Sequence, residues 1–501
     1  MHFTLISPRL AIQKGDFLGS GVPYWPVELA TLAAYLRDGG DQVHMVDQFG
    51  TNPSFLTDAG DHYLQGVPLS SFLEDDAVKN TDAFVLFAIS YMSHGELLNS
   101  VRELKAKFPS VPVSVLENAQ AVTAYSLQRV APDYFNAGVD ALICGEPYCN
   151  WVEIKTFLAD SCQGKVPANL ITSASDHAPV RSLMSNWKHP IPAWELFNLE
   201  GYWKLPYSHG PKTPRFLPIF TSRGCPYPCD FCVVPETSNH QWRGNSPVDV
   251  VDEMIALRDR FGVRDFQVED LNPTVQHQRW EEICELLIAK QADIHFSFVS
   301  GTKAETVRID KIPLFAHAGC RYLSISPESG SKDLMKIIGK KFNYQHAIDL
   351  VRTCREYGIR TQACFLVGHP DEQEHDIKHS LEYLIKMVRN GLDEVAIFVV
   401  APFAGSKLYS RNEITLQSKS ALPSFSPKGR VGYETLERRR KALIRAFFIE
   451  KLKRGLDLWL QGVRALWGVP QTKMENLPRR IVYIYWAITR LKISQMWGRD
   501  S

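Results

Sequence analysis

Short apolar runs alternate with helical segments along the first 150 residues. The runs lie at residues 2–7, 42–47, 83–90, 112–116 and 141–146, and segments between them, such as 27–40, repeat their apolar residues at helical spacing. Strands separated by helices in this way form βαβ units, whose parallel sheet is covered on both faces. We therefore predict an α/β, Rossmann-like doubly wound domain over residues 1–150, with ligand contacts at the carboxyl ends of its strands.

A second series of the same kind begins near residue 216. Amphipathic segments such as 247–261 and 280–290 separate six apolar runs, at 217–222, 265–270, 294–300, 320–326, 360–368 and 394–402. Six successive strand–helix units predict a partial (β/α)6 barrel over residues 216–412. In barrels of this kind the catalytic groups follow the carboxyl ends of the strands.

Two stretches break the alternation. Residues 151–215 form a connector rich in proline, which precludes long regular elements, and in aromatic residues. These aromatic side chains either line an apolar pocket or seal a domain interface; they are Trp187, Trp194, Tyr202, Trp203 and Tyr207. Residues 413–501 are helical and basic, with 17 Lys or Arg against 6 Asp or Glu over 428–500. This region is either a cap over the barrel, which we favour, or a surface for contact with a membrane.

The whole chain carries a formal net charge of +1, so its global charge gives no reason to expect nucleic-acid binding. No apolar stretch reaches the roughly 18 residues that a membrane-spanning helix needs, and the N-terminus lacks the pattern of a secretory signal. We expect a cytoplasmic protein, peripheral to the membrane if its C-terminal helices contact lipid.

Three of the ten cysteines lie within eight residues, where Cys225, Cys229 and Cys232 have the spacing C-x3-C-x2-C. Three thiolates on one loop can ligate three irons of a cubane cluster and leave the fourth iron open to a substrate. Structural zinc needs four protein ligands, and the nearest candidate for a fourth is His240. The sequence favours the cluster because it contains no second cysteine pair; the other seven cysteines are typical of small core residues.

This motif resembles that of the radical S-adenosylmethionine (SAM) superfamily, and the aromatic residue before the third cysteine, Phe231, fits the family pattern. The resemblance implies a [4Fe-4S] cluster, SAM bound to its open iron, and reductive cleavage of SAM to a 5′-deoxyadenosyl radical. It also implies an electron donor such as flavodoxin or ferredoxin.

Further segments, over about residues 215–410, resemble the SAM contacts of the family in their order behind the cysteines. They follow the second, fourth and fifth predicted strands, and the resemblance assigns to SAM binding Glu269, Asp270, Ser326, Glu328, Ser329, Gly368 and Glu372. A carboxylate there would pair with the SAM ammonium group. Taken alone, an acidic residue after a strand is more often a helix cap and a glycine more often a turn, and no catalytic residue is assigned.

Residues 1–150 resemble the cobalamin-binding domain that precedes many radical SAM barrels, and the resemblance assigns Asp47, Ser90, Gly145 and Glu146 to cobalamin. The chain has no Asp-x-His-x-x-Gly segment, so we expect no histidine ligand to cobalt. At 115–120 it has Val-Leu-Glu-Asn-Ala-Gln where relatives carry glycines, and side chains there hinder a close approach of the backbone. A scaffold domain that has lost its cofactor is the alternative.

The resemblance predicts a cobalamin-dependent radical SAM enzyme. The first hypothesis for its reaction is methylation of an unactivated carbon in a small-molecule or lipid intermediate. The second hypothesis is a radical rearrangement, cyclisation or carbon–carbon bond formation, with or without cobalamin. A non-catalytic iron–sulfur or scaffold protein is a hypothesis of another class. The sequence does not identify the substrate.

Overall fold

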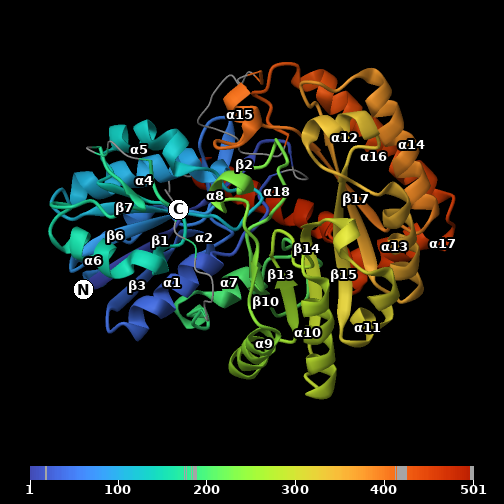
Figure 1. Cartoon of the computed structure of the whole chain (residues 1–501). Coiled ribbons are helices and arrows are strands. Elements are labelled where there is room, and N and C mark those ends of the chain that lie inside the picture. The colour runs from blue at the N-terminus through green and yellow to red at the C-terminus, as the bar shows by residue number, and fades with distance from the viewer. Residues whose placement is uncertain are drawn as a thin grey trace.

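The computed structural model describes residues 1–16, 20–173, 175, 178–181, 183, 189–411, 413–414 and 426–496. Trp187 of the connector lies outside these described residues. Two six-stranded sheets make up the framework, the first at the left and the second at the right of Figure 1.

The first sheet has the strand order β3-β1-β6-β7-β8-β9. Its parallel strands are β1 (His2–Ser7), β3 (Gln42–Asp47), β6 (Ala83–Ala88), β7 (Val113–Glu117) and β8 (Ala141–Ile143), and the short β9 (Leu170–Ile171) is antiparallel. The chain adds strands first on one side of β1 and then on the other, so the topological switch point lies between β1 and β6.

Helices cover both faces of this sheet, as the alternation of patterns predicts. One face packs against α1 (Val27–Asp38) and α6 (Trp151–Ala159), and the other against α4 (His94–Lys107) and α5 (Ala131–Ala137). The start of the connector is more regular than its prolines indicate, because Trp151, Ile154 and Leu158 recur at helical spacing and are buried under the sheet.

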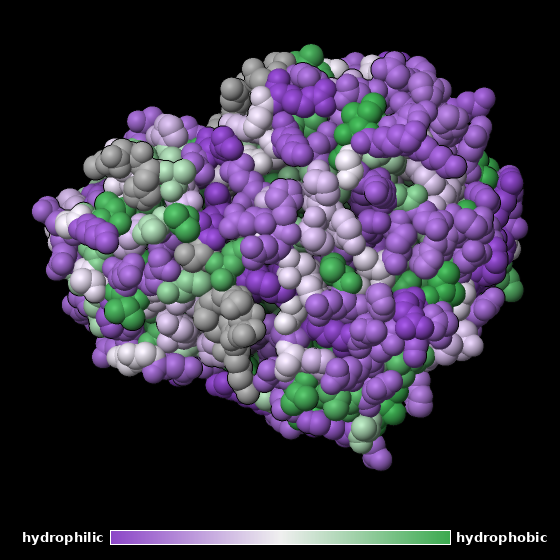
Figure 2. All heavy atoms as spheres, in the orientation of Figure 1, coloured by the Kyte–Doolittle hydropathy of each residue, from purple (hydrophilic) through white to green (hydrophobic). Residues whose placement is uncertain are grey.

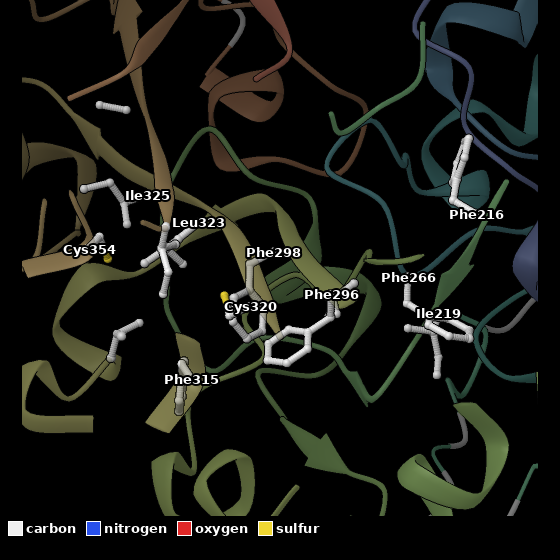
Figure 3. Close-up of a cluster of buried hydrophobic side chains, with 14 of the residues drawn as sticks. Phe216, Ile219, Phe266, Phe296, Phe298, Phe315, Cys320, Leu323, Ile325 and Cys354 are labelled. Carbon is white, nitrogen blue, oxygen red and sulfur yellow. The ribbon is translucent and has the colours of Figure 1, made fainter. Parts of the chain in front are cut away.

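The second sheet is parallel throughout, with its strands in chain order, which confirms the partial barrel. The strands are β10 (Phe216–Ile219), β13 (Asp265–Val268), β14 (His295–Thr302), β15 (Cys320–Glu328), β16 (Arg360–Val367) and β17 (Glu394–Val399). The outer helices are α9 (Pro247–Phe261), α10 (His277–Ala289), α11 (Ile312–His317), α12 (Lys332–Ile338), α13 (Tyr344–Glu356) and α14 (Glu374–Arg389). Figure 3 shows part of the core, where Phe296, Phe298 and Phe315 pack close together.

Shorter elements connect these layers. A three-stranded antiparallel sheet, which the pattern did not predict, contains β2 (Leu10–Gln13), β4 (Leu56–Asp58) and β5 (His62–Gln65). A two-stranded ribbon contains β11 (Ser222–Arg223) and β12 (Arg243–Gly244). The short helices are α2 (Gln48–Thr51), α3 (Asp76–Lys79), α7 (Leu199–Trp203), α8 (Val234–Thr237) and α15 (Lys407–Arg411), with 3-10 turns η1 (Leu69–Ser71), η2 (Tyr91–Ser93), η3 (Leu127–Val130), η4 (Pro147–Asn150), η5 (Trp194–Leu196), η6 (Ala304–Thr306), η7 (Ile309–Lys311) and η8 (Met474–Asn476).

The C-terminal region forms three helices, α16 (Tyr433–Leu452), α17 (Leu456–Trp467) and α18 (Leu477–Met496). Helix α16 packs on α14 and β17, so it closes the far side of the barrel. Helix α18 reaches back to β4 beside the first sheet. Among the described residues, no helix combines the length and the apolar character needed to cross a membrane.

Candidate active site

The three motif cysteines lie on the loop between β11 and α8, just after the first barrel strand, and each is half-buried. Asp270, at the end of β13, fixes the start of this loop: its carboxylate accepts hydrogen bonds from the Thr221 N–H at 2.7 Å and the Thr221 hydroxyl at 2.6 Å. Gly224 has φ +74°, and a Cβ there would lie 2.1 Å from the Gln241 carbonyl oxygen. The loop therefore requires glycine before its first cysteine.

The three thiols influence one another electrostatically. Burial raises the pKa of each, to about 11 for Cys229, and Cys225 raises the pKa of both Cys229 and Cys232. The Lys340 ammonium group lowers all three pKa values. Three neighbouring soft donors beside a fixed positive charge fit a cluster that takes each thiolate on a different iron.

Among the described residues, no group of three His, Cys, Asp or Glu side chains, the three cysteines included, is arranged around a position for one metal ion. His240, the candidate fourth ligand, is exposed.

Lys340 joins two of the predicted SAM residues to the cysteine loop. Its Nζ donates hydrogen bonds to the Ser326 hydroxyl at 2.8 Å and to Glu328 Oε1 at 2.7 Å. Both partners of the Lys340–Glu328 ion pair have side chains only 7% exposed. Glu328 also has φ +58°, a left-handed conformation that is uncommon for a residue with a side chain. This buried pair lies where β15 ends, beside the cysteines.

The other predicted SAM residues have different surroundings. Ser329 shares a 3.0 Å hydrogen bond with Ser380 on α14, so it organises the turn after β15. Gly368 has φ +84° and donates its N–H to Glu372 Oε2 at 2.7 Å. Burial raises the pKa of Glu372 to about 7. Phe231 packs between two apolar clusters, one from α12 and one around Val400.

Glu269 points away from Asp270, its neighbour in sequence, and binds a residue of the connector. Its Oε2 lies 2.6 Å from His209 Nδ1, and the His209 ring lies 5.0 Å from the Tyr24 ring. Burial, and next the Glu269 charge, raise the pKa of Tyr24 far above its usual range, while a hydrogen bond with Thr123 lowers it. Residues of the first domain, the connector and the barrel thus lie next to one another around Glu269.

A small cavity, of about 20 Å³, lies at this meeting point. Its walls come from the loops that follow β6 and β7 in the first sheet and β10 and β13 in the barrel, and from β14 itself. The lining residues include Tyr24, Ile89, Asn118, Gln120, His209, Phe220, Glu269 and Ser300. Gln120 also accepts a 3.2 Å hydrogen bond from the Gly224 N–H, so the first sheet contacts the cysteine loop directly.

The barrel interior is polar, and the C-terminal region contributes to it. Lys473, just before η8, donates a 2.7 Å hydrogen bond to the Val299 carbonyl oxygen and lies 5.8 Å from the centre of the Tyr322 ring. Burial lowers the pKa of Lys473, and the charges of Cys364 and Glu394 partly offset this shift by raising it. A cation inside the barrel can orient an anionic group on a substrate.

The four residues predicted for cobalamin lie along the carboxyl edge of the first sheet, and each has protein partners. Asp47 Oδ1 accepts from the Gly50 N–H at 3.0 Å, and burial raises its pKa to about 6. Ser90 accepts from the Met92 N–H. Glu146 pairs with Arg243 at 2.7 Å. The Gly145 N–H donates to Glu117 Oε2, and the same oxygen pairs with Arg181 at 3.0 Å.

Residues 219–384, which hold most of the barrel and the cysteine loop, match the radical SAM superfamily. The barrel region belongs to the radical SAM superfamily. Membership makes the protein a radical SAM enzyme whose cofactors include a [4Fe-4S] cluster and SAM.

Curated relatives of this radical SAM enzyme include methyltransferases. An uncharacterized methyltransferase of Pyrococcus horikoshii is 24% identical over 317 residues, which cover 62% of this chain and 66% of the relative. The cytidylyl-2-hydroxyethylphosphonate methyltransferase of Streptomyces wedmorensis is 25% identical over 422 residues, which cover 77% of each chain. The chain thus spans about two thirds to three quarters of the length of these relatives.

Solved radical SAM structures share the fold over both halves of the chain. The cobalamin-dependent radical enzyme OxsB, with aqua-cobalamin and SAM bound, covers 99% of this chain and 81% of its own, with a TM-score of 0.65 and 14% identity. The methyltransferase TsrM from Kitasatospora setae, with cobalamin and a [4Fe-4S] cluster bound, covers 81% of this chain and 77% of its own, with a TM-score of 0.57 and 16% identity.

The sequence motifs did not single out several residues of this site. Lys340 lies twelve residues after Glu328, and Tyr24, His209 and Lys473 come from three other regions of the chain. Their roles depend on tertiary contacts. The sequence offered one signal for these residues. Each has an ionisable or aromatic side chain and lies in a segment that precedes or follows a helix or strand.

Proposed function

We propose that this radical SAM enzyme is cobalamin-dependent and transfers a methyl group to an unactivated carbon of a small-molecule or lipid intermediate. The meeting of two carboxyl edges carries the proposal. The small cavity lies beside the carboxyl edge of the first sheet, where doubly wound domains bind ligands, and beside the carboxyl ends of the barrel strands, where barrels place their chemistry. Its volume of about 20 Å³ is smaller than any substrate, so a substrate would enter between the two edges only if the surrounding loops moved apart.

Residues of the barrel would hold the cluster and SAM. Cys225, Cys229 and Cys232 would ligate the cluster, and the buried Ser326 and Glu328 beside Lys340 would contact SAM. When bound, these cofactors supply the one-electron chemistry that removes a hydrogen atom from the substrate, and cobalamin carries the methyl group. The protein orients the substrate and excludes water from the pocket.

A corrinoid would bind along the carboxyl edge of the first sheet, where Ile89 and Asn118, on the loops after β6 and β7, line the cavity. Ser90 and Gly145 on the same edge offer small side chains for a close approach. Towards β8, the buried Glu117–Arg181 pair occupies the carboxyl edge of the sheet. A corrinoid could therefore bind at this part of the edge only if the Arg181 side chain moved.

A radical cyclisation is the second candidate. The anaerobic magnesium-protoporphyrin IX monomethyl ester cyclase of Rubrivivax gelatinosus is 25% identical over 290 residues. For either reaction we propose a small electron donor such as flavodoxin or ferredoxin.

Anaerobic purification with cobalamin, followed by absorption spectra and SAM-cleavage assays with dithionite, tests the proposal. Wild type should show both cofactors. A Cys225→Ala/Cys229→Ala/Cys232→Ala variant should lose cluster absorption and SAM cleavage and keep cobalamin. With substrate, S-adenosylhomocysteine and a methylated product should form; 5′-deoxyadenosine without S-adenosylhomocysteine would exclude methyl transfer and favour the second candidate.

A further inference from the structure

Helix α17 carries its large apolar side chains on the outside. Leu456, Trp459 and Trp467 are 70%, 64% and 79% exposed, and their spacing places them on one face of the helix. The residues that α17 buries against the protein are Gln461 and Ala465. This is the reverse of the usual arrangement, in which a surface helix turns its apolar stripe towards the core.

The exposed apolar side chains of this protein are concentrated in the same region. Of the 21 large hydrophobic residues that are exposed in the described part of the chain, 13 lie between Ile449 and Met496. Elsewhere the surface is ordinary: on the face that Figure 2 shows, hydrophobic residues are scattered among hydrophilic ones. A concentration of exposed apolar side chains marks a surface that contacts a membrane or another protein.

Helix α18 has a second exposed stripe. Val482, Tyr485, Trp486, Ile493 and Met496 are each 49% or more exposed and recur at helical spacing. Arg490 lies 4.7 Å from the centre of the Trp486 ring, so a cation accompanies the aromatic residue on this stripe.

Ion pairs fix α17 in this orientation. Asp457 pairs with Arg355 on α13 at 2.7 Å, and Arg464 pairs with Glu475 at 2.9 Å. Before the helix, Gly455 has φ +70° and separates α17 from α16. The apolar face therefore points outward because the polar side of the helix is anchored to the barrel.

The exposed charge of the C-terminal region is mainly positive. Its exposed basic residues are Arg438, Lys441, Arg445, Lys453, Arg490 and Lys492, of which Lys441 and Lys453 pair with Glu437 and Glu450, and Glu434 is an exposed acidic residue. Arg490 and Lys492 lie on α18 itself. The acidic Glu450, Asp457 and Glu475 are paired with arginine or lysine. A second copy of the chain would bring positive charge against positive charge, whereas anionic lipid headgroups are complementary.

We propose that α17 and α18 dock this protein on an anionic lipid surface, with Trp459 and Trp467 of α17 and Trp486 of α18 inserted at the level of the headgroups. Tryptophan suits this interface because its ring is apolar and its N–H is a hydrogen-bond donor. The docking surface is made by the C-terminal helices alone and does not depend on the proposed reaction.

Flotation of the full-length protein with vesicles tests the proposal without any cofactor. Wild type should float with vesicles of phosphatidylcholine and phosphatidylglycerol, and about tenfold less with phosphatidylcholine alone or in high salt. A Trp459→Gln/Trp467→Gln variant should lose about tenfold in bound fraction. The matched control, Val152→Gln/Val248→Gln, changes two residues on α6 and α9 that are 75% and 49% exposed, and it should bind like wild type.

Two results would overturn the proposal. The first is wild type that stays unbound with anionic vesicles. The second is a dimer in sedimentation that the α17 variant dissolves, which would assign the face to self-association. If the variant fails to fold, quenching of wild-type tryptophan fluorescence by brominated lipids gives an independent readout: quenching supports insertion, and its absence opposes it.

Discussion

At the scale of single residues, Lys340 has the clearest electrostatic effect on the cysteine loop. It lowers the pKa of all three thiols and is itself buried between them and Glu328. A positive charge that favours thiolate also favours the addition of an electron to a cluster that the thiolates hold. Lys340 therefore influences how easily the cluster is reduced, in addition to holding Glu328 in place.

Replacement of Lys340 by Met should make the cluster harder to reduce, because the added electron loses a nearby positive charge. Lys341→Met is the matched control, since Lys341 is the next residue and is exposed. An EPR-monitored redox titration of the reconstituted proteins should place the reduction potential of Lys340→Met below those of wild type and of the control. Equal potentials would contradict this role.

At the scale of elements, hydrophobic periodicity predicted the two parallel sheets because each buried strand and amphipathic helix has its own local pattern. It missed β2, β4 and β5, whose strands have only three or four residues. The order of segments behind the cysteines indicated the site. The sequence alone could not show which of the two neighbours, Glu269 or Asp270, faces the pocket. Successive residues at a strand end point in different directions, and tertiary partners decide which one faces the pocket.

The end of β7 offers a test at the same scale. Glu117 lies in the stretch 115–120, where the resemblance to cobalamin-binding domains leads us to expect glycines, and it pairs with Arg181 at 3.0 Å. A Glu117→Gly/Arg181→Ala variant should bind cobalamin several-fold more tightly than wild type, because it clears the edge and leaves no buried charge unpaired.

Anaerobic equilibrium dialysis of both proteins measures this change in affinity. The single variant Glu117→Gly should fold less stably, since it removes the nearer of the two carboxylates beside the buried Arg181 and leaves only Glu236, at 4.0 Å. Weaker cobalamin binding by the double variant would show that the pair belongs to the binding site and does not obstruct it.

At the scale of the whole molecule, buried ion pairs join the first sheet to the barrel. Glu28 of α1 pairs with Arg223, two residues before Cys225, at 2.7 Å, and Glu146 pairs with Arg243 of β12. Both pairs act on the ribbon that carries the cysteine loop. The relative position of the two halves is therefore coupled to the geometry of the iron–sulfur site.

This coupling predicts that Glu28→Gln destabilises the protein and also lowers its cluster content. Glu28 and Arg223 have side chains 5% and 6% exposed, and breaking a buried pair by removing one partner costs about 3–5 kcal/mol. Arg37→Gln is the control, because the Arg37–Glu195 pair also spans distant segments but is 45% and 30% exposed, and such pairs contribute about 0–1 kcal/mol. Urea denaturation of the metal-free proteins measures the free energy of unfolding, and iron analysis measures the cluster. A Glu28→Gln protein that loses stability but incorporates iron like the control would separate the interface from the cysteine loop.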